Sequence, residues 1–194
     1  KITIIKLIHY TTKQKAKVIK VIIGLFVVAV LAVFFLFFTN NTQLEKEEFF
    51  VYFPTGSTYG DAKKILSAHV KSMSSFELMA KLRSYPENVK SGRFLLKKGM
   101  NTFQIVGAMR RNVPVNLAFN NQERLEDFAG RIASQLECDS LSILNAFKDK
   151  QFLEENGFTE ENVLAVCIPN SYEYFWNTTA EKFRDKMAKE YRKF

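Results

Sequence analysis

The sequence contains few of the residues that build disulfide scaffolds, metal sites or catalytic triads. It has two cysteines and two histidines among its 194 residues. Two cysteines exclude a small disulfide-rich scaffold, and neither His9 nor His69 has a second ligand at the spacing that zinc sites use. One histidine in the body of the chain does not make a Ser-His-Asp triad. No glycine-rich phosphate loop is present either, so we predict a protein with no cofactor and no metal.

Acidic residues are missing from the start of the chain. Residues 1–20 carry six lysines and no Asp or Glu, whereas the remaining residues carry 22 basic and 20 acidic side chains. The excess positive charge therefore belongs to a leading tail and does not indicate a nucleic-acid-binding body. We predict no nucleic-acid partner.

A long apolar run follows this tail. Val21 to Phe38 are 18 consecutive residues without a charged or strongly polar side chain, and a helix of that length spans ~27 Å of the roughly 30 Å hydrocarbon core. The run is longer than the apolar part of a signal peptide, and no small-residue cleavage site follows it. We predict a basic cytoplasmic tail over residues 1–20 and an uncleaved transmembrane anchor over 18–39. The lysines then keep the N-terminus in the cytoplasm and place residues 40–194 outside.

The outer part repeats a strand, a turn and an amphipathic helix. Strands are predicted at 49–53, 93–96 and 115–119, and each is followed by apolar residues at three- and four-residue steps. The fold class is α+β, and residues 49–96 have the strand–helix–helix–strand order of a small module. Cap residues predict further helix starts at Ser74 with Glu77, Asn120 with Glu123, Thr178 with Glu181, and at Asp139 for a helix that ends near Gly157.

The two cysteines leave two interpretations open. Cys138 and Cys167 lie on segments that both look buried. Outside the cytoplasm they could form a disulfide. Two reduced thiols within a core explain the same pattern.

An aromatic segment near the end of the chain is the candidate binding site. Residues 168–176 contain the only tryptophan, and Pro169 breaks local helix, so we expect an irregular or extended segment. Aromatic faces beside polar groups often hold sugar rings, although aromatic packing in a core gives the same composition. The candidate substrate-binding residues are Asn170, Tyr172, Glu173, Tyr174 and Trp176.

The order of these features resembles the YceG-like endolytic murein transglycosylases. Pro169–Tyr172 is similar to the family's Pro-(Asp/Asn)-Thr-Tyr motif, and the turns at 53–58 and 98–102 are similar to its repeated turn-and-helix pattern. The resemblance covers roughly residues 13–194. The amino-acid sequence of Asn170–Asn177 is most similar to that of Bacteroidota members of the family.

The resemblance implies a LysM-like βααβ module over residues 40–112 and the start of a mixed α/β transglycosylase domain over 113–194. It implies a single-pass protein of the cell inner membrane with a periplasmic body that acts on peptidoglycan glycan strands beside peptidoglycan synthases or division proteins. It also implies cleavage within the strand to a 1,6-anhydro-muramyl end, with one buried glutamate of raised pKa as acid and then base.

One departure from the family concerns this glutamate. The resemblance places it in an Ala-Ser-(Ile/Val)-(Ile/Val)-Glu-x-Glu segment after the helix that begins near Thr179, and no such segment occurs before Phe194. Glu137 ends a superficially similar stretch in the wrong place, so we do not assign it as catalytic. Leu164-Ala165 also replaces the family's Glu-Gly pair. We therefore expect the catalytic residue after Phe194 and an inactive 194-residue piece of a longer lyase.

Two alternatives stay open at this point. The chain suits a non-catalytic, membrane-anchored peptidoglycan-binding or scaffold module. A conventional glycosidase with Glu173 as its acid is a weaker alternative, because no partner carboxylate is identifiable.

Overall fold

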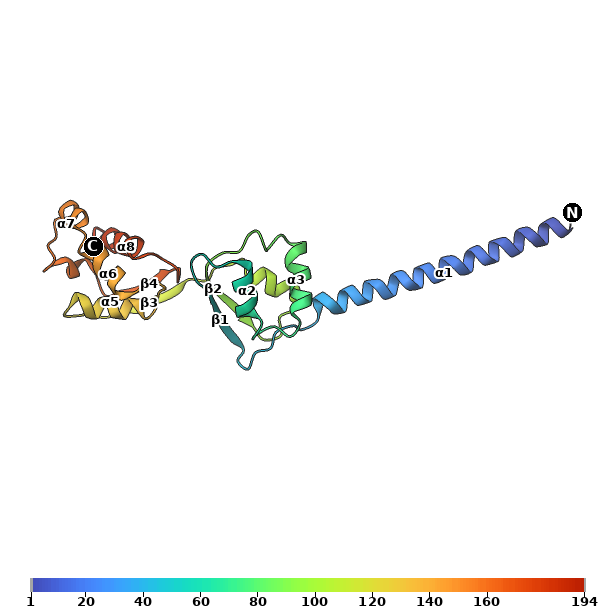
Figure 1. The fold of residues 1–194 in the computed structure, drawn as a ribbon, viewed down its shortest axis with the longest axis horizontal. Coiled ribbons are helices and arrows are strands. Elements are labelled where there is room, and N and C mark those ends of the chain that lie inside the picture. The colour runs from blue at the N-terminus through green and yellow to red at the C-terminus, as the bar shows by residue number, and fades with distance from the viewer. Residues whose placement is uncertain (1, 194) are drawn as a thin grey trace.

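The computed structural model describes the backbone of residues 2–193 and the side chains of residues 17–193. Its parts follow one another along the long axis of the molecule (Figure 1). Helix α1 (Ile2–Phe38) extends from one end, a small α/β module lies in the middle, and a second α/β module forms the other end. Each of the two modules has its own cluster of buried apolar residues. The sequence predicts the α+β class, and both modules do combine helices with strands.

Helix α1 contains the predicted apolar span. One segment of it, Lys17–Phe38, is long and apolar enough to cross a membrane. Phe37 is buried, and the other side chains of this segment are exposed. Of the six tail lysines, Lys17 and Lys20 are exposed, while the side chains of the other four lie outside the described residues.

The middle module follows the predicted strand–helix–helix–strand order. Its elements are β1 (Glu48–Phe53), α2 (Tyr59–Leu66), α3 (Met73–Leu82), β2 (Gly92–Lys97) and α4 (Thr102–Ala108). Strands β1 and β2 pair antiparallel, with Glu48 opposite Lys97 and Phe53 opposite Gly92. The predicted strands at 49–53 and 93–96 are thus confirmed. Alternate strand residues point into one core, whose largest buried members are Phe53, Phe76, Tyr85, Phe94, Leu66 and Leu96.

Local capping explains where two of these helices begin. The Thr58 side chain accepts the Asp61 N–H, and the Asp61 carboxylate accepts the Thr58 N–H, so a complete capping box opens α2. The predicted start at Ser74 is wrong, because α3 begins at Met73 with Ser72 as its cap. The Ser72 N–H donates to the side chain of Asn41 at 2.7 Å, which holds Ser72 outside the helix.

A buried asparagine joins α1 to the middle module. The Asn41 N–H donates to Met100 O at 2.8 Å, and its side-chain amide donates to Ser72 O at 3.1 Å and to Thr102 Oγ1 at 3.0 Å. Because Asn41 and Thr102 are both buried, this connection is part of the module's packed interior and not a loose linker.

The C-terminal module is built on a second antiparallel strand pair. It contains β3 (Val115–Phe119), α5 (Leu125–Ala133), α6 (Ser140–Phe147), α7 (Lys150–Asn156), the 3₁₀ helix η1 (Val163–Val166), β4 (Asn170–Tyr174) and α8 (Ala180–Tyr191). Strand β3 lies where the sequence predicts it, and the aromatic segment is extended as β4. Val115 faces Tyr174, and Phe119 faces Asn170. Helix α6 packs against both α5 and α8 over a core that includes Leu117, Phe128, Ile132, Phe147 and Phe183.

The single helix expected from Asp139 to Gly157 is two helices. Asp139 caps α6 and Gly157 ends α7 with a left-handed φ of 71°, as predicted. Between them, Asp149 leaves the helical conformation with φ −60° and ψ 121°. Its side chain accepts the Phe152 N–H at 2.9 Å and starts a new helix.

Two other predicted caps are wrong. Asn120 does not open α5, because its side chain accepts from Gln122 at 2.8 Å, and the helix starts after Arg124 without a side-chain cap. Helix α8 is capped by Thr179 and not by Thr178, because the Thr178 hydroxyl donates to Phe175 O at 2.6 Å.

Of the two interpretations of Cys138 and Cys167, the structure supports two reduced thiols rather than a disulfide. Cys138 is half-buried, Cys167 is buried, and both are free. Burial raises the pKa of each thiol, so both are protonated near neutral pH.

Candidate functional site

Two of the five candidate binding residues point into the C-terminal core. The Tyr174 ring is buried against Phe183, with ring centres 5.0 Å apart. The half-buried Tyr172 ring stacks on Phe119 at 5.7 Å, and its hydroxyl donates to Ile168 O at 2.8 Å. Burial raises the pKa of both phenols. Both rings therefore pack on the core side of the β3–β4 pair.

The opposite face of the same strand pair is open and polar. Glu173 and Ser171 are exposed on β4, and the register places them opposite Asn116 and Ala118 of β3, which are also exposed. This alternation follows from the pleat, which sends successive side chains to opposite faces. Amide, hydroxyl and carboxylate groups here can exchange hydrogen bonds with sugar hydroxyls.

Asn170 lines a hollow at one end of this face. The hollow has a volume of about 840 Å³. Its polar lining combines Asn170 and Ser171 with the acid Asp127 and the base Arg131. A second hollow of about 430 Å³ shares Asn120, Gln122 and Pro169 with the first. The first residues of the Pro169–Tyr172 motif therefore line concave surface.

Trp176 lies apart from these residues, at the junction of the two modules. Its half-buried indole meets the edge of Tyr52 from β1, with ring centres 5.0 Å apart. Its carbonyl oxygen accepts the Glu137 N–H at 2.8 Å. The structure thus distributes the predicted residues over the core side of β4, its open face and the junction.

The junction contains residues that the sequence did not single out as a site. Both carboxylate oxygens of Glu137 accept hydrogen bonds from Thr55, which lies in the turn after β1. Asn112 donates to Asn177 Oδ1 at 3.3 Å, and the Arg93 side chain donates to Pro114 O. Because Thr55 and Glu137 are 82 positions apart, no local spacing could have indicated this contact.

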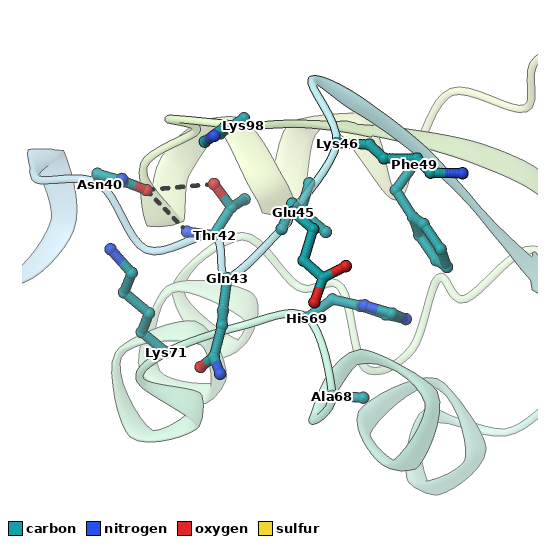
Figure 2. Close-up of a pocket in the computed structure, with 11 residues that line it drawn as sticks. Asn40, Thr42, Gln43, Glu45, Lys46, Phe49, Ala68, His69, Lys71 and Lys98 are labelled. Atoms are coloured by element: carbon teal, nitrogen blue, oxygen red, sulfur yellow. Dashed lines mark hydrogen bonds between the residues drawn. The ribbon is translucent and has the colours of Figure 1, made fainter.

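Another pocket lies at the α1 end of the middle module (Figure 2). It has a volume of about 600 Å³, and Lys46, Lys71 and Lys98 contribute cations to its lining. His69 also lines it and lies in the turn after α2. Its ring is 4.2 Å from that of Phe49, and burial lowers its pKa. This pocket shares no residue with the predicted glycan site.

Within residues 17–193, no three His, Cys, Asp or Glu side chains gather closely enough to hold a metal ion. The open face of β3–β4 offers hydrogen-bonding groups to a ligand, and the junction offers the aromatic surface of Trp176 and Tyr52.

Comparison with known proteins assigns the chain to a family. The sequence profile of the YceG-like family matches residues 51–194, which is most of the chain. No protein with a curated description matches it. A solved chain from Listeria monocytogenes that is described as YceG-like has 26% sequence identity and a TM-score of 0.38. The match covers 76% of this chain and 55% of that one, so this chain spans about half the length of the solved protein. From the profile match, the chain belongs to the YceG-like family.

Proposed function

We propose that this chain is part of a membrane-anchored, endolytic lytic transglycosylase that cleaves peptidoglycan glycan strands in the periplasm. The YceG-like family is known as a family of murein transglycosylases. The observation that carries the proposal is the family match over residues 51–194.

Helix α1 supports the membrane anchor. Lys17–Phe38 contains 22 residues, which correspond to ~33 Å of helix, enough for the hydrocarbon core. Its exposed apolar side chains would be unfavourable in water over such a length. The lysines at its start support a cytoplasmic N-terminus and a periplasmic body at the cell inner membrane.

The two modules then have separate roles. Residues 40–112 serve as a LysM-like module next to the membrane, and residues 113–194 open the transglycosylase domain. We assign glycan binding to the open face of β4 through Glu173, to the hollow at its end through Asn170, and to the junction through Trp176. Tyr172 and Tyr174 hold β4 in place from the core side.

The reaction that the family resemblance implies uses one glutamate. As an acid it protonates the leaving glycosidic oxygen, and as a base it then accepts the proton of the sugar's own 6-hydroxyl, whose oxygen bonds to the anomeric carbon. The product has a 1,6-anhydro end, and no water is consumed. We assign this glutamate to no residue of the 194-residue chain, which we expect to bind glycan without cleaving it.

The test compares this chain with the product of the intact gene. Both are reconstituted in lipid and incubated with purified glycan strands, and the products are analysed by mass spectrometry. The proposal expects internal fragments with 1,6-anhydro ends from the intact product, and sedimentation with peptidoglycan but no cleavage from the 194-residue chain. Anhydro products from the 194-residue chain would refute our placement of the glutamate. Binding without cleavage by either protein would favour the non-catalytic scaffold.

A further inference from the structure

An exposed apolar patch lies on the middle module where α1 enters it. It consists of Leu78 and Leu82 on α3 and Phe103 on α4, whose exposed fractions are 46%, 67% and 44%. Leu78 and Leu82 are four residues apart, so they lie on the same side of α3. Helices α3 and α4 pack together, and Arg83, which follows Leu82, lies over the Phe103 ring. Large exposed apolar side chains on two adjoining helices indicate a surface that is covered in the working protein.

The patch is continuous with the apolar surface of α1. Phe38, the last residue of the apolar segment, stacks on Phe103 with ring centres 6.1 Å apart and planes 20° apart. Phe34 stacks in turn on Phe38 at 5.6 Å. Helix α1 also packs against both α3 and α4. A bilayer that surrounds α1 therefore reaches these module residues directly.

The orientation of the patch relative to α1 is fixed. Phe37 is part of the buried core of the middle module, and Asn41 is hydrogen-bonded to Ser72 and Thr102 inside it. The module cannot turn away from α1 without breaking this packing.

Helix α3 lies across the end of the module that faces α1, and runs across the direction of α1 (Figure 1). When α1 spans a bilayer, α3 consequently lies along the membrane surface. Basic groups surround the apolar residues: the Arg83 guanidinium lies 4.5 Å above the Phe103 ring and donates to Phe103 O at 3.3 Å. Arg110 donates to Arg83 O at 3.2 Å, and Lys81 is exposed. Apolar side chains with neighbouring Lys and Arg are typical of helices that lie in the lipid headgroup region.

We propose that the patch of Leu78, Leu82 and Phe103 inserts into the outer face of the phospholipid bilayer, so that the middle module rests on the membrane. This inference depends on the proposed membrane anchor. The bilayer is the surface that covers the patch, because α1 places the patch beside the lipid and because the nearby basic residues can bind lipid phosphates.

The test measures how deeply chosen positions lie in the bilayer. Trp176→Phe removes the only tryptophan of the chain, and single tryptophans are then introduced as Leu82→Trp, Phe103→Trp, Val28→Trp and Leu141→Trp. The full chain is reconstituted into vesicles of phosphatidylethanolamine and phosphatidylglycerol that contain no brominated lipid, lipid brominated near the headgroup, or lipid brominated deep in the acyl chains. The deep bromines test Val28, which lies at the middle of Lys17–Phe38. Leu82, Val28 and Leu141 are exposed side chains, so these substitutions do not disturb a core, and circular dichroism checks each fold.

The expected result is about twofold quenching by brominated lipid, with blue-shifted emission, for Leu82→Trp and Phe103→Trp. Leu141→Trp, on α6 of the far module, should be unaffected. Val28→Trp reports the anchor alone. Quenching at Val28 without quenching at Leu82 and Phe103 would overturn the resting module while leaving the anchor intact. No quenching at Val28 would instead refute the anchor and both proposals that depend on it.

Discussion

Glu137 and Thr55 bind each other across the junction of the two modules. One carboxylate oxygen of Glu137 accepts the Thr55 N–H, and the other accepts the Thr55 hydroxyl, each at 2.6 Å. The Tyr52–Trp176 ring contact lies at the same junction. Glu137 therefore has a structural partner in the other module, which agrees with leaving it out of the catalytic assignment.

Removing this carboxylate should loosen the junction. In Glu137→Ala the Thr55 N–H loses its acceptor, so its hydrogen exchange should accelerate about tenfold, a change that corresponds to about 1.4 kcal/mol of opening free energy. Hydrogen–deuterium exchange followed by mass spectrometry of the peptide around Thr55 measures this. Glu154→Ala removes an exposed carboxylate that pairs with Lys150 and serves as the control. Unchanged exchange at Thr55 in Glu137→Ala would show that the contact does not hold the junction.

Replacing two glycines by alanine should change the unfolding free energy in opposite directions. Gly92 has φ 138°, and a Cβ there would collide with the Asn112 side chain, so Gly92→Ala should lose about 1–3 kcal/mol of unfolding free energy. Gly130 lies inside α5 with open space around it, so Gly130→Ala should gain about 0.5–1 kcal/mol. Urea unfolding measures both. A neutral Gly92→Ala would contradict the packing of Asn112 against β2.

Substitutions at Trp176 and Tyr174 should distinguish an effect on glycan binding from an effect on folding. Trp176→Ala should weaken sedimentation with peptidoglycan by roughly fivefold, or about 1 kcal/mol, because one aromatic contact is lost. Tyr174→Phe keeps the buried ring and loses only the hydroxyl that donates to Phe183 O at 3.5 Å. It should leave binding unchanged and lose about 0.5–1 kcal/mol of stability, whereas Tyr174→Ala should lose about 3–5 kcal/mol. If Trp176→Ala is folded and binds normally, the junction is not part of the glycan site.

The stability of the C-terminal module should fall at acidic pH as the Asp139 carboxylate becomes protonated. Hydrogen bonds from Ser142 lower the pKa of this carboxyl below its ordinary value of 3.8. Because the pKa is lower in the folded chain than in the unfolded chain, the Asp139 carboxylate contributes its full stabilisation above the pKa of the unfolded chain. That contribution is lost as the pH falls through the pKa of the folded chain. Asp139→Asn retains a cap at neutral pH and should show a shallower loss of stability below about pH 4. Thermal unfolding from pH 7 to about pH 3 measures this, and parallel curves for the two proteins would contradict it.

Local signals in the sequence predicted the elements well. Short apolar runs predict the three strands, and Asp139 and Gly157 mark helix ends because their effect reaches only three or four residues. Asp149, Asn120 and Ser74 were missed or misassigned because several nearby polar groups compete for the same backbone donors. The choice among them depends on tertiary contacts such as that between Asn41 and Ser72.

The candidate site was less predictable for the same reason. The sequence indicates that residues 168–176 are extended and aromatic, but the strand partner decides which rings face the core. Pairing with β3 turns Tyr172 and Tyr174 inward and leaves Glu173 outward. The approach of Trp176 to Tyr52 joins residues from two modules, and no pattern within either module contains that information.

The bonded connection at Asn41 has a consequence for where the protein works. Asn41 ties the end of α1 into the middle module. If α1 is the membrane anchor that we propose, the folded dimensions of that module therefore set the distance from the lipid to Trp176. The proposed glycan site would then meet its strands at one constant height above the membrane. Lengthening the chain between Phe38 and Asn41 would make that height variable without altering either module.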